Sequence, residues 1–291
     1  MRAYNIFIIT VFFSINISAQ ESNLEKYTPS ILFSKGQWEL NTFFNIYTQN
    51  SIRDKNGDKI ELSSRQTYLN GLLQYTLGVS NNARINVGMD FMFNRSFYDS
   101  RSGNPLKVIY SGDGDYQRTV LSAIGPRIRF VPIKEINNLS IQSTFLFPVA
   151  KNQEAPLFTA HDRYTWFTQI FFDQRLNNKW RLFLEGDVLY RIKRYSDQTN
   201  FVRFPVSAFI NYFPSSKASL YTNIQYSPRF ENISNEFDEQ FGFTSWFTQV
   251  GIGGKYQLTS KLGAELSYGN FINSRGDGAG YTINFGLRYI H

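Results

Sequence analysis

The chain has 291 residues, no cysteine, 18% charged residues, 17% aromatic residues and a net charge of +7. The absence of cysteine excludes disulfides, thiolate metal sites and a lipid-anchored N-terminal cysteine. Mean hydropathy is −0.33, and no run approaches the roughly 18 to 20 apolar residues that a membrane-spanning helix needs.

Residues 1–19 have the features of a secretory signal peptide. Arg2 supplies a positive charge, Ile6 to Phe13 form a short apolar run, and the small residue Ala19 precedes the expected cleavage point. A buried N-terminal strand is the alternative, but the order of these features favours export. Cleavage removes Arg2 and no acid, so it lowers the net charge by one from +7.

After this segment, the sequence alternates between apolar and polar residues in stretches typical of strands. We predict twelve strands, at about 37–50, 66–79, 84–98, 117–130, 139–150, 164–176, 180–194, 201–213, 218–230, 244–258, 262–273 and 281–291. Each is long enough for the 9 to 11 residues of a tilted membrane strand. No stretch has a convincing helical period.

The links between these strands alternate in length. The short ones are 80–83, 131–138, 177–179, 214–217 and 259–261, and the more polar, mostly longer ones are 51–65, 99–116, 151–163, 195–200, 231–243 and 274–280. Short turns at one end and longer loops at the other are typical of an up-and-down outer-membrane barrel, whereas a β-sandwich has irregular Greek-key links. An even strand count places both termini on the short-turn, periplasmic side.

Several strands have one apolar and one polar face. In 180–194, Leu182, Leu184 and Val188 alternate with Arg181, Glu185 and Asp187. With no helices to cover the apolar face, lipid can cover it if the sheet closes. The sequence therefore predicts an all-β, transmembrane up-and-down antiparallel β-barrel of about 12 strands over 37–291, preceded by the signal peptide at 1–19 and a periplasmic segment at 20–36. The expected location is a bacterial outer membrane, with its lipids as partners.

The last strand, 281–291, must pair with the first to close the barrel. Tyr281, Ile283, Phe285, Leu287 and Tyr289 would face lipid, and Arg288 the lumen. The stretch resembles the C-terminal signal that the barrel-assembly machinery recognises, although that signal usually ends on Phe or Trp and this chain ends on His291. The resemblance implies this machinery as a partner.

Two sets of residues fit the barrel poorly. Pro126, Pro148 and Pro205 fall inside predicted strands, where each removes a ladder hydrogen bond. Four aromatic residues fall on the expected lumenal face, namely Phe167, Phe171, Phe183 and Phe209.

Charged residues on the lumenal face are the candidate functional set. Alternation predicts that the lumen is lined by Arg84, Asp90, Arg127, Arg129, Arg181, Glu185, Asp187, Arg191, Lys193, Arg203, Arg229, Lys255, Glu265 and Arg288. They either pair across a narrow barrel and fill it, or form a cationic path that favours anionic or polarisable solutes. Barrels of about eight strands are filled and those of 16 to 18 hold a channel, so twelve strands leave both alternatives open.

No catalytic, cofactor or metal residues are predicted. His161 and Asp162 lie near the outer rim without a serine in a local motif, which favours a solvated loop over a hydrolase. "DKNGDK" at 54–59 matches the first three ligand positions of a calcium loop, but Lys59 and Arg65 occupy the required Gly and Glu positions. We expect a polar hairpin there, and Gly-rich turns at "GDGD" (112–115) and "RGD" (275–277).

The segment 113–153 resembles the transporter-like outer-membrane barrels associated with the meta-pathway of phenol degradation. The similarity lies in "GDGD" at 112–115, the Gly125–Arg129 stretch and Phe147-Pro148. It implies passage of small molecules, aromatic ones among them. The "SAQ" end of the signal peptide, at 18–20, and the strands rich in Asn, Tyr and Phe also resemble those of Bacteroidetes outer-membrane proteins.

The expected function is a passive channel or transporter for small solutes, without enzymatic activity, cofactor or nucleic-acid partner. The alternative is a structural or interaction barrel with a filled lumen and partner-binding outer loops.

Overall fold

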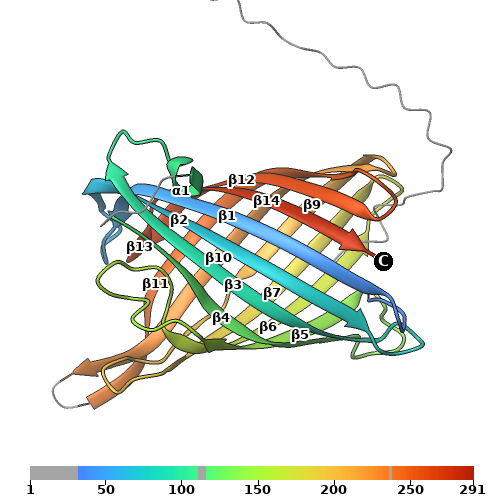
Figure 1. The fold of residues 1–291 in the computed structure, drawn as a ribbon, viewed down its shortest axis with the longest axis horizontal. Helices are drawn as coiled ribbons and strands as arrows, with labels where there is room; N and C mark the ends of the chain where they lie inside the picture. The colour runs from blue at the N-terminus through green and yellow to red at the C-terminus, as the bar shows by residue number, and fades with distance from the viewer. Residues whose placement is uncertain (1–31, 111–115, 236–237) are drawn as a thin grey trace, which may run out of the picture.

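The computed structural model describes residues 32–110, 116–235 and 238–291. Figure 1 shows long tilted strands that wrap into a barrel. The strands are β1 (Trp38–Arg53), β2 (Lys59–Gly78), β3 (Ile85–Ser100), β4 (Gln117–Phe130), β5 (Leu139–Pro148), β6 (Arg163–Arg175), β7 (Trp180–Lys193), β8 (Phe201–Arg203), β9 (Val206–Ser215), β10 (Ala218–Asn235), β11 (Asp238–Gln257), β12 (Leu262–Arg275), β13 (Asp277–Gly278) and β14 (Tyr281–Ile290).

The sheet closes on itself through β1, which pairs antiparallel with β2 on one side and β14 on the other. The strands β8 and β9 share one position between β7 and β10, and β13 is a two-residue extension beside β1. The barrel therefore has the predicted twelve strands. Closure leaves no unpaired edge, which is the condition for a sheet in lipid.

Two of the predicted loops are largely strand. In the first hairpin, β1 and β2 stay paired up to Arg53 and Lys59, so the expected loop at 51–65 shrinks to residues 54–58. The β10 and β11 backbones likewise pair up to Asn235 and Asp238 instead of leaving a loop at 231–243. The polarity of these segments led to the wrong boundaries, because polar side chains do not prevent backbone pairing above a membrane.

Of the three prolines, only Pro205 interrupts a strand. It lies between β8 and β9, where its carbonyl accepts a hydrogen bond from the Asp187 N–H at 2.8 Å. Pro126 lies inside β4 opposite Met89, and Pro148 is the last residue of β5. The predicted strand 201–213 is therefore two shorter strands in line.

One turn of helix, α1 (Lys107–Tyr110), lies in the loop after β3, where the sequence predicts no helix. Lys107 forms an ion pair with Asp99 at 2.9 Å, and Val108 is fully buried. No helix among the described residues is long and apolar enough to cross a membrane.

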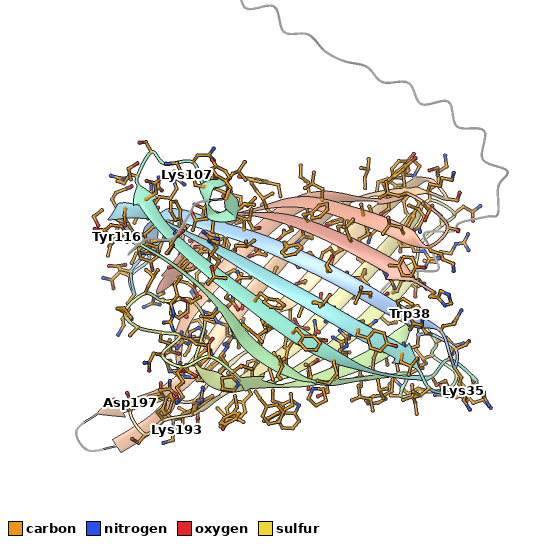
Figure 2. The ribbon with its side chains drawn as sticks, in the orientation of Figure 1. Lys35, Trp38, Lys107, Tyr116, Lys193 and Asp197 are labelled. Atoms are coloured by element: carbon orange, nitrogen blue, oxygen red, sulfur yellow. The ribbon has the colours of Figure 1, made fainter. Side chains whose placement is uncertain are left out.

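The two ends of the barrel differ. The turn end holds the short links and both Lys35 and Trp38, and the loop end holds the long links with Lys107, Tyr116, Lys193 and Asp197 (Figure 2). At the turn end, the Trp38 and His291 rings stack with centroids 5.4 Å apart, and their backbones exchange hydrogen bonds of 3.2 and 2.9 Å. The C-terminal strand is paired to its last residue, as predicted.

The outer surface of the barrel is apolar. Ile252 and Leu266 are 65% and 61% exposed. In β14, the apolar side chains predicted to face lipid, Ile283, Phe285 and Leu287, alternate with the inward Asn284. Aromatic contacts lie near both ends, including Trp180–Tyr212 at 4.9 Å and Tyr226–Trp246 at 5.8 Å. An apolar band with aromatic residues at its borders is the surface expected of a transmembrane barrel.

The predictions for residues 1–31 and 112–115, which include the signal peptide, most of 20–36 and "GDGD", lie outside the described residues. From 32 onwards the chain packs against the turn end. Leu32 and Phe33 are 6% and 5% exposed, and the Phe33 N–H donates to Asn86 Oδ1 at 3.2 Å.

Candidate functional site: the lumen

A belt of amide and hydroxyl side chains crosses six neighbouring strands on the inner wall. Its members, in strand order, are Ser267, Asn284, Asn45, Asn70, Asn94 and Ser122. Asn45 donates to Asn284 Oδ1 at 2.5 Å and accepts from Asn70 at 3.1 Å. Directly opposite residues in antiparallel strands lie close enough to bond in this way. On this side of the lumen, the uncharged side chains of the belt therefore satisfy one another's hydrogen-bonding groups.

A cavity of about 500 Å³ lies inside the barrel. Amides such as Asn45, Gln169 and Gln249 line part of it, and Phe167, Phe183 and Phe209 line another part. The volume falls within the range of about 300 to 1,000 Å³ typical of small-molecule sites. We call it the central chamber.

The aromatic part of the chamber wall is a row of rings on adjacent strands. Phe171, Phe183, Phe209 and Tyr221 come from β6, β7, β9 and β10, with successive centroid separations of 5.9, 5.5 and 5.9 Å. Gly253 makes room for this row, because a Cβ there would lie 2.4 Å from the Tyr221 ring. Three of the four inward phenylalanines that fit the sequence pattern poorly, Phe171, Phe183 and Phe209, thus form one continuous apolar surface, and the fourth, Phe167, lines the chamber.

The central chamber continues towards the turn end. A smaller cavity of about 160 Å³ shares Phe43, Lys255 and Glu265 with it, and is also lined by Arg129 and Arg288. A third cavity, of about 280 Å³, lies at the loop end and is lined by Tyr47, Tyr68 and Phe158 among others. It shares no described lining residue with the central chamber.

A circuit of side-chain contacts separates the central chamber from the loop-end cavity. Ring contacts run through Phe247, Phe271, Tyr47, Tyr68, Phe158, His161 and Phe201, with centroid separations of 4.7, 5.1, 6.1, 6.0, 5.0 and 5.1 Å. Arg229 lies over Phe201 at 3.9 Å, and Arg203, which is opposite Arg229, lies over Phe247 at 5.6 Å. We call this circuit the closing layer.

The loop 149–162 supplies two members of the closing layer, Phe158 and His161. Three anchors hold it inward: Ser96 donates to the Phe158 carbonyl at 2.6 Å, fully buried Gln153 donates to the Ser122 carbonyl at 3.0 Å, and Asp162 pairs with Arg194 at 2.8 Å. The loop reaches from the β3–β4 side to Phe201 of β8.

His161 is a structural member of this layer. Its Nδ1 lies 3.3 Å from Glu154, which also pairs with Arg163. Burial, together with the neighbouring charge of Arg191, lowers the pKa of His161, and its ring is packed between Phe158 and Phe201. These neighbours supply no nucleophile, so the geometry gives no catalytic constellation around His161.

The possible calcium loop forms a polar hairpin. The Asp54 Oδ1 accepts hydrogen bonds from the Asn56 and Asp58 N–H groups at 2.8 and 2.9 Å. This carboxylate therefore stabilises its own turn. The described residues contain no group of three or more potential metal ligands.

The fourteen predicted lumen residues fall into four groups. Arg181, Glu185, Asp187, Lys255 and Glu265 line the central chamber. Arg129 and Arg288 line the turn-end cavity, which Lys255 and Glu265 also reach. Arg191, Arg203 and Arg229 surround the closing layer at Phe201 and Phe247.

The remaining four residues have other surroundings. Arg127 and Asp90 form an ion pair at 3.0 Å with side chains 2% and 6% exposed. Arg84 donates to the Val131 carbonyl at 3.0 Å at the turn end, and Lys193 is exposed at the last position of β7 at the loop end (Figure 2). The charges therefore divide between packed pairs and cavity walls instead of forming one continuous cationic path.

The charges around the central chamber are mainly acidic. Four carboxylates line it, those of Asp173, Glu185, Asp187 and Glu265, against the two cations Arg181 and Lys255. Arg181 pairs with Asp173 at 3.0 Å and Lys255 with Glu265 at 3.4 Å. Positive charge instead gathers at the closing layer. Asp173 and the amides are not among the predicted lumen residues, although their alternation in the same strands identifies their inward face.

The closed barrel, its apolar exterior and its polar lumen define a transmembrane β-barrel of the outer-membrane type. No family model and no curated protein sequence matches the chain. Among solved structures, the fold is similar to the COG4313 outer membrane channel from Pseudomonas putida F1, with a TM-score of 0.65 and 13% identity over 90% of this chain and 98% of that chain. It is also similar to the beta domain of the Bordetella autotransporter Brka, with a TM-score of 0.52 and 12% identity over 87% of this chain and 98% of that one.

Proposed function

We propose that the protein is an outer-membrane channel through which small solutes pass without energy input. The observation that carries the proposal is the central chamber of about 500 Å³, which is enclosed in a closed barrel and continues into the turn-end cavity. A barrel whose only role is structural does not need this space, because side chains fill small barrels. The similarity in fold to an outer membrane channel supports the same conclusion.

In this proposal, a solute crosses the closing layer and enters the chamber. Passage requires Phe158 and His161 to move, since both bridge the wall to Phe201. The aromatic row would contact apolar ring faces, and the amides would bond polar edges. This lining is compatible with the small aromatic solutes that the resemblance to the phenol-pathway barrels implies.

The location follows from the same proposal. Export by the 1–19 segment, recognition of 281–291 by the barrel-assembly machinery, surrounding outer-membrane lipids and a Bacteroidetes-like origin all stay predictions. The exposed apolar band and its aromatic borders support the lipid partner.

Conductance of the purified barrel in a planar bilayer tests the channel. We expect discrete openings, and a larger open fraction in the double variant Phe158→Ala/His161→Ala, which removes two bridging rings. Phe44→Ala is the matched control, because it removes an aromatic ring that is 41% exposed on the outer face. Silence of both the wild type and the double variant, with the folded form intact, would reject the channel and favour the structural barrel.

A further inference from the structure

The strand register brings like charges together at the closing layer. Arg203 of β8 is directly opposite Arg229 of β10, and Arg163 of β6 is directly opposite Lys193 of β7. Like charges directly opposite each other in a sheet are destabilising. The repulsion in this region therefore requires counter-charges.

Three of the arginines have such a counter-charge in the protein. Arg203 pairs with Asp277 at 2.5 Å and Arg229 with Glu231 at 2.5 Å, while Arg163 pairs with Glu154. These carboxylates come from three different parts of the chain, namely β13, β10 and the loop 149–162. Each of them forms a direct ion pair with one of the three guanidinium groups.

Arg191 differs from these three. Within the described residues it has no carboxylate partner, and its buried Nε has no hydrogen-bond acceptor. Its guanidinium carbon lies 5.8 Å from the centroid of the Phe201 ring. Burying a guanidinium without a direct ion pair costs free energy. A partner from outside the chain would therefore stabilise Arg191.

Phe201 makes the environment of Arg191 dry. The ring is 1% exposed and is also contacted by Arg163 at 5.5 Å and Arg229 at 3.9 Å. Three guanidinium groups thus surround one buried ring. Charges in such a place are screened less by salt than exposed ones, and they attract an anion more strongly.

We infer that Arg191, beside Phe201, binds the oxyanion of a small solute, either a carboxylate or a phosphate. The planar fork of a guanidinium matches two oxygens of such a group, whereas a spherical anion such as chloride uses only part of it. The Phe201 ring provides a flat apolar surface next to the anion. The inference deepens the proposed function, because it makes the closing layer a selective site for anionic solutes ahead of the more acidic central chamber.

Thermal unfolding of the purified full-length barrel in detergent, at constant ionic strength, measures this binding without requiring conduction. The probes are sodium benzoate and sodium phosphate, with sodium chloride as the reference salt. We expect benzoate, phosphate or both to raise the unfolding midpoint of the wild type beyond the chloride reference. Stronger benzoate binding would indicate a carboxylate solute, and stronger phosphate binding a phosphorylated one.

Arg191→Gln should weaken the apparent affinity for the effective probe about tenfold or more, as expected for loss of a charged hydrogen bond. Arg191→Lys keeps the charge and loses the fork, so its affinity should be intermediate. Arg175→Gln is the matched control, because Arg175 is an exposed arginine at the turn end that bonds Asn178. It should bind the probe like the wild type.

The unfolding midpoint without added probe is a second readout. Removing an uncompensated charge should leave the midpoint of Arg191→Gln unchanged or higher. A lower midpoint with an unchanged response to the probes would show that Arg191 is only a structural residue. Absence of stabilisation by both probes in the wild type would also reject the site.

The inference and the channel can fail separately. Conductance without oxyanion binding would reject the site and keep the channel. Oxyanion binding by a barrel that stays silent in the bilayer, together with its Phe158→Ala/His161→Ala variant, would keep the site and reject the channel.

Discussion

Arg127 and Asp90 form a buried ion pair on neighbouring strands of the inner wall, with Arg127 Nη1 3.0 Å from Asp90 Oδ1. The register places Gly88 opposite Arg127, and a Cβ at Gly88 would lie 3.2 Å from the guanidinium. Arg127 also contacts the Thr76 hydroxyl on the next strand. The pair therefore ties three strands together and is part of the packed wall.

Removal of the Asp90 charge should destabilise the barrel. Asp90→Asn leaves Arg127 as a buried charge without its partner, which costs about 3–5 kcal/mol in comparable cases. Denaturant unfolding in detergent, followed by the gel shift of the folded form, measures the loss. Glu61→Gln is the control, since Glu61 and its partner Lys59 are 44% and 54% exposed and such pairs contribute about 0–1 kcal/mol.

A double substitution separates charge burial from packing. In Asp90→Leu/Arg127→Met both charges are absent, so stability should return towards the wild-type value. Equal damage in the single and double variants would contradict the ion-pair account. The pair is also unavailable to solutes, so substitution of Arg127 should not change ion preference unless the barrel unfolds.

Deletion of 281–291 should abolish the folded barrel. The segment pairs with β1 from Glu39 to Thr48 and with β12 from Leu262 to Asn270. Its loss leaves two unpaired edges, which lipid does not satisfy. Loss of the heat-modifiable band on a gel is the measurement. The control His291→Ala should keep this band, and a deletion variant that also keeps it would show that closure does not depend on β14.

Protease added to intact cells should cut the loop end. Lys55 lies in the exposed turn 54–58, and Lys107 lies in α1 of the 101–116 loop. Trypsin should cleave at these positions and spare Lys179 and Lys261 in turn-end links. Mass spectrometry of the released peptides identifies the sites. Cleavage at Lys179 and Lys261 alone would reverse the expected orientation.

Acidification should loosen the loop 149–162. Burial and the charge of Arg191 lower the pKa of His161 from its usual 6.5. Burial alone would raise the pKa of Glu154, but its bonds with His161 and the charge of Arg163 lower it from 4.5 overall. Both groups bind protons more tightly in the opened loop, so the packed loop is fully stabilised above pH 6.5 and loses stability as the pH falls.

Hydrogen exchange of peptides from 149–162 checks this dependence at about pH 7.5 and about pH 5.5, after correction for intrinsic rates. Protection should fall at the lower pH in the wild type. In His161→Asn this loss of protection should disappear, because the residue that titrates between the two pH values is absent. An equal loss of protection in the wild type and in His161→Asn would contradict the role of His161.

The alternation of apolar and polar residues was enough to predict the barrel, its twelve strands and the closing pair of β14 with β1. This succeeds because side chains alternate across a strand, so a lipid-covered face appears directly in the sequence. Alternation also placed Arg191, Arg203 and Arg229 on the lumenal face.

The function of the inward side chains depends on the tertiary structure. Arg127 and Arg191 have the same inward parity, yet one has a buried partner at 3.0 Å and the other has none among the described residues. The difference arises from which residues the register sets opposite each arginine and from the loop 149–162, which folds onto Phe201 from a distant part of the chain. Alternation fixes the face on which a side chain lies, but it leaves shifts of two residues in the register and the path of a loop open, because both depend on contacts between residues far apart in sequence.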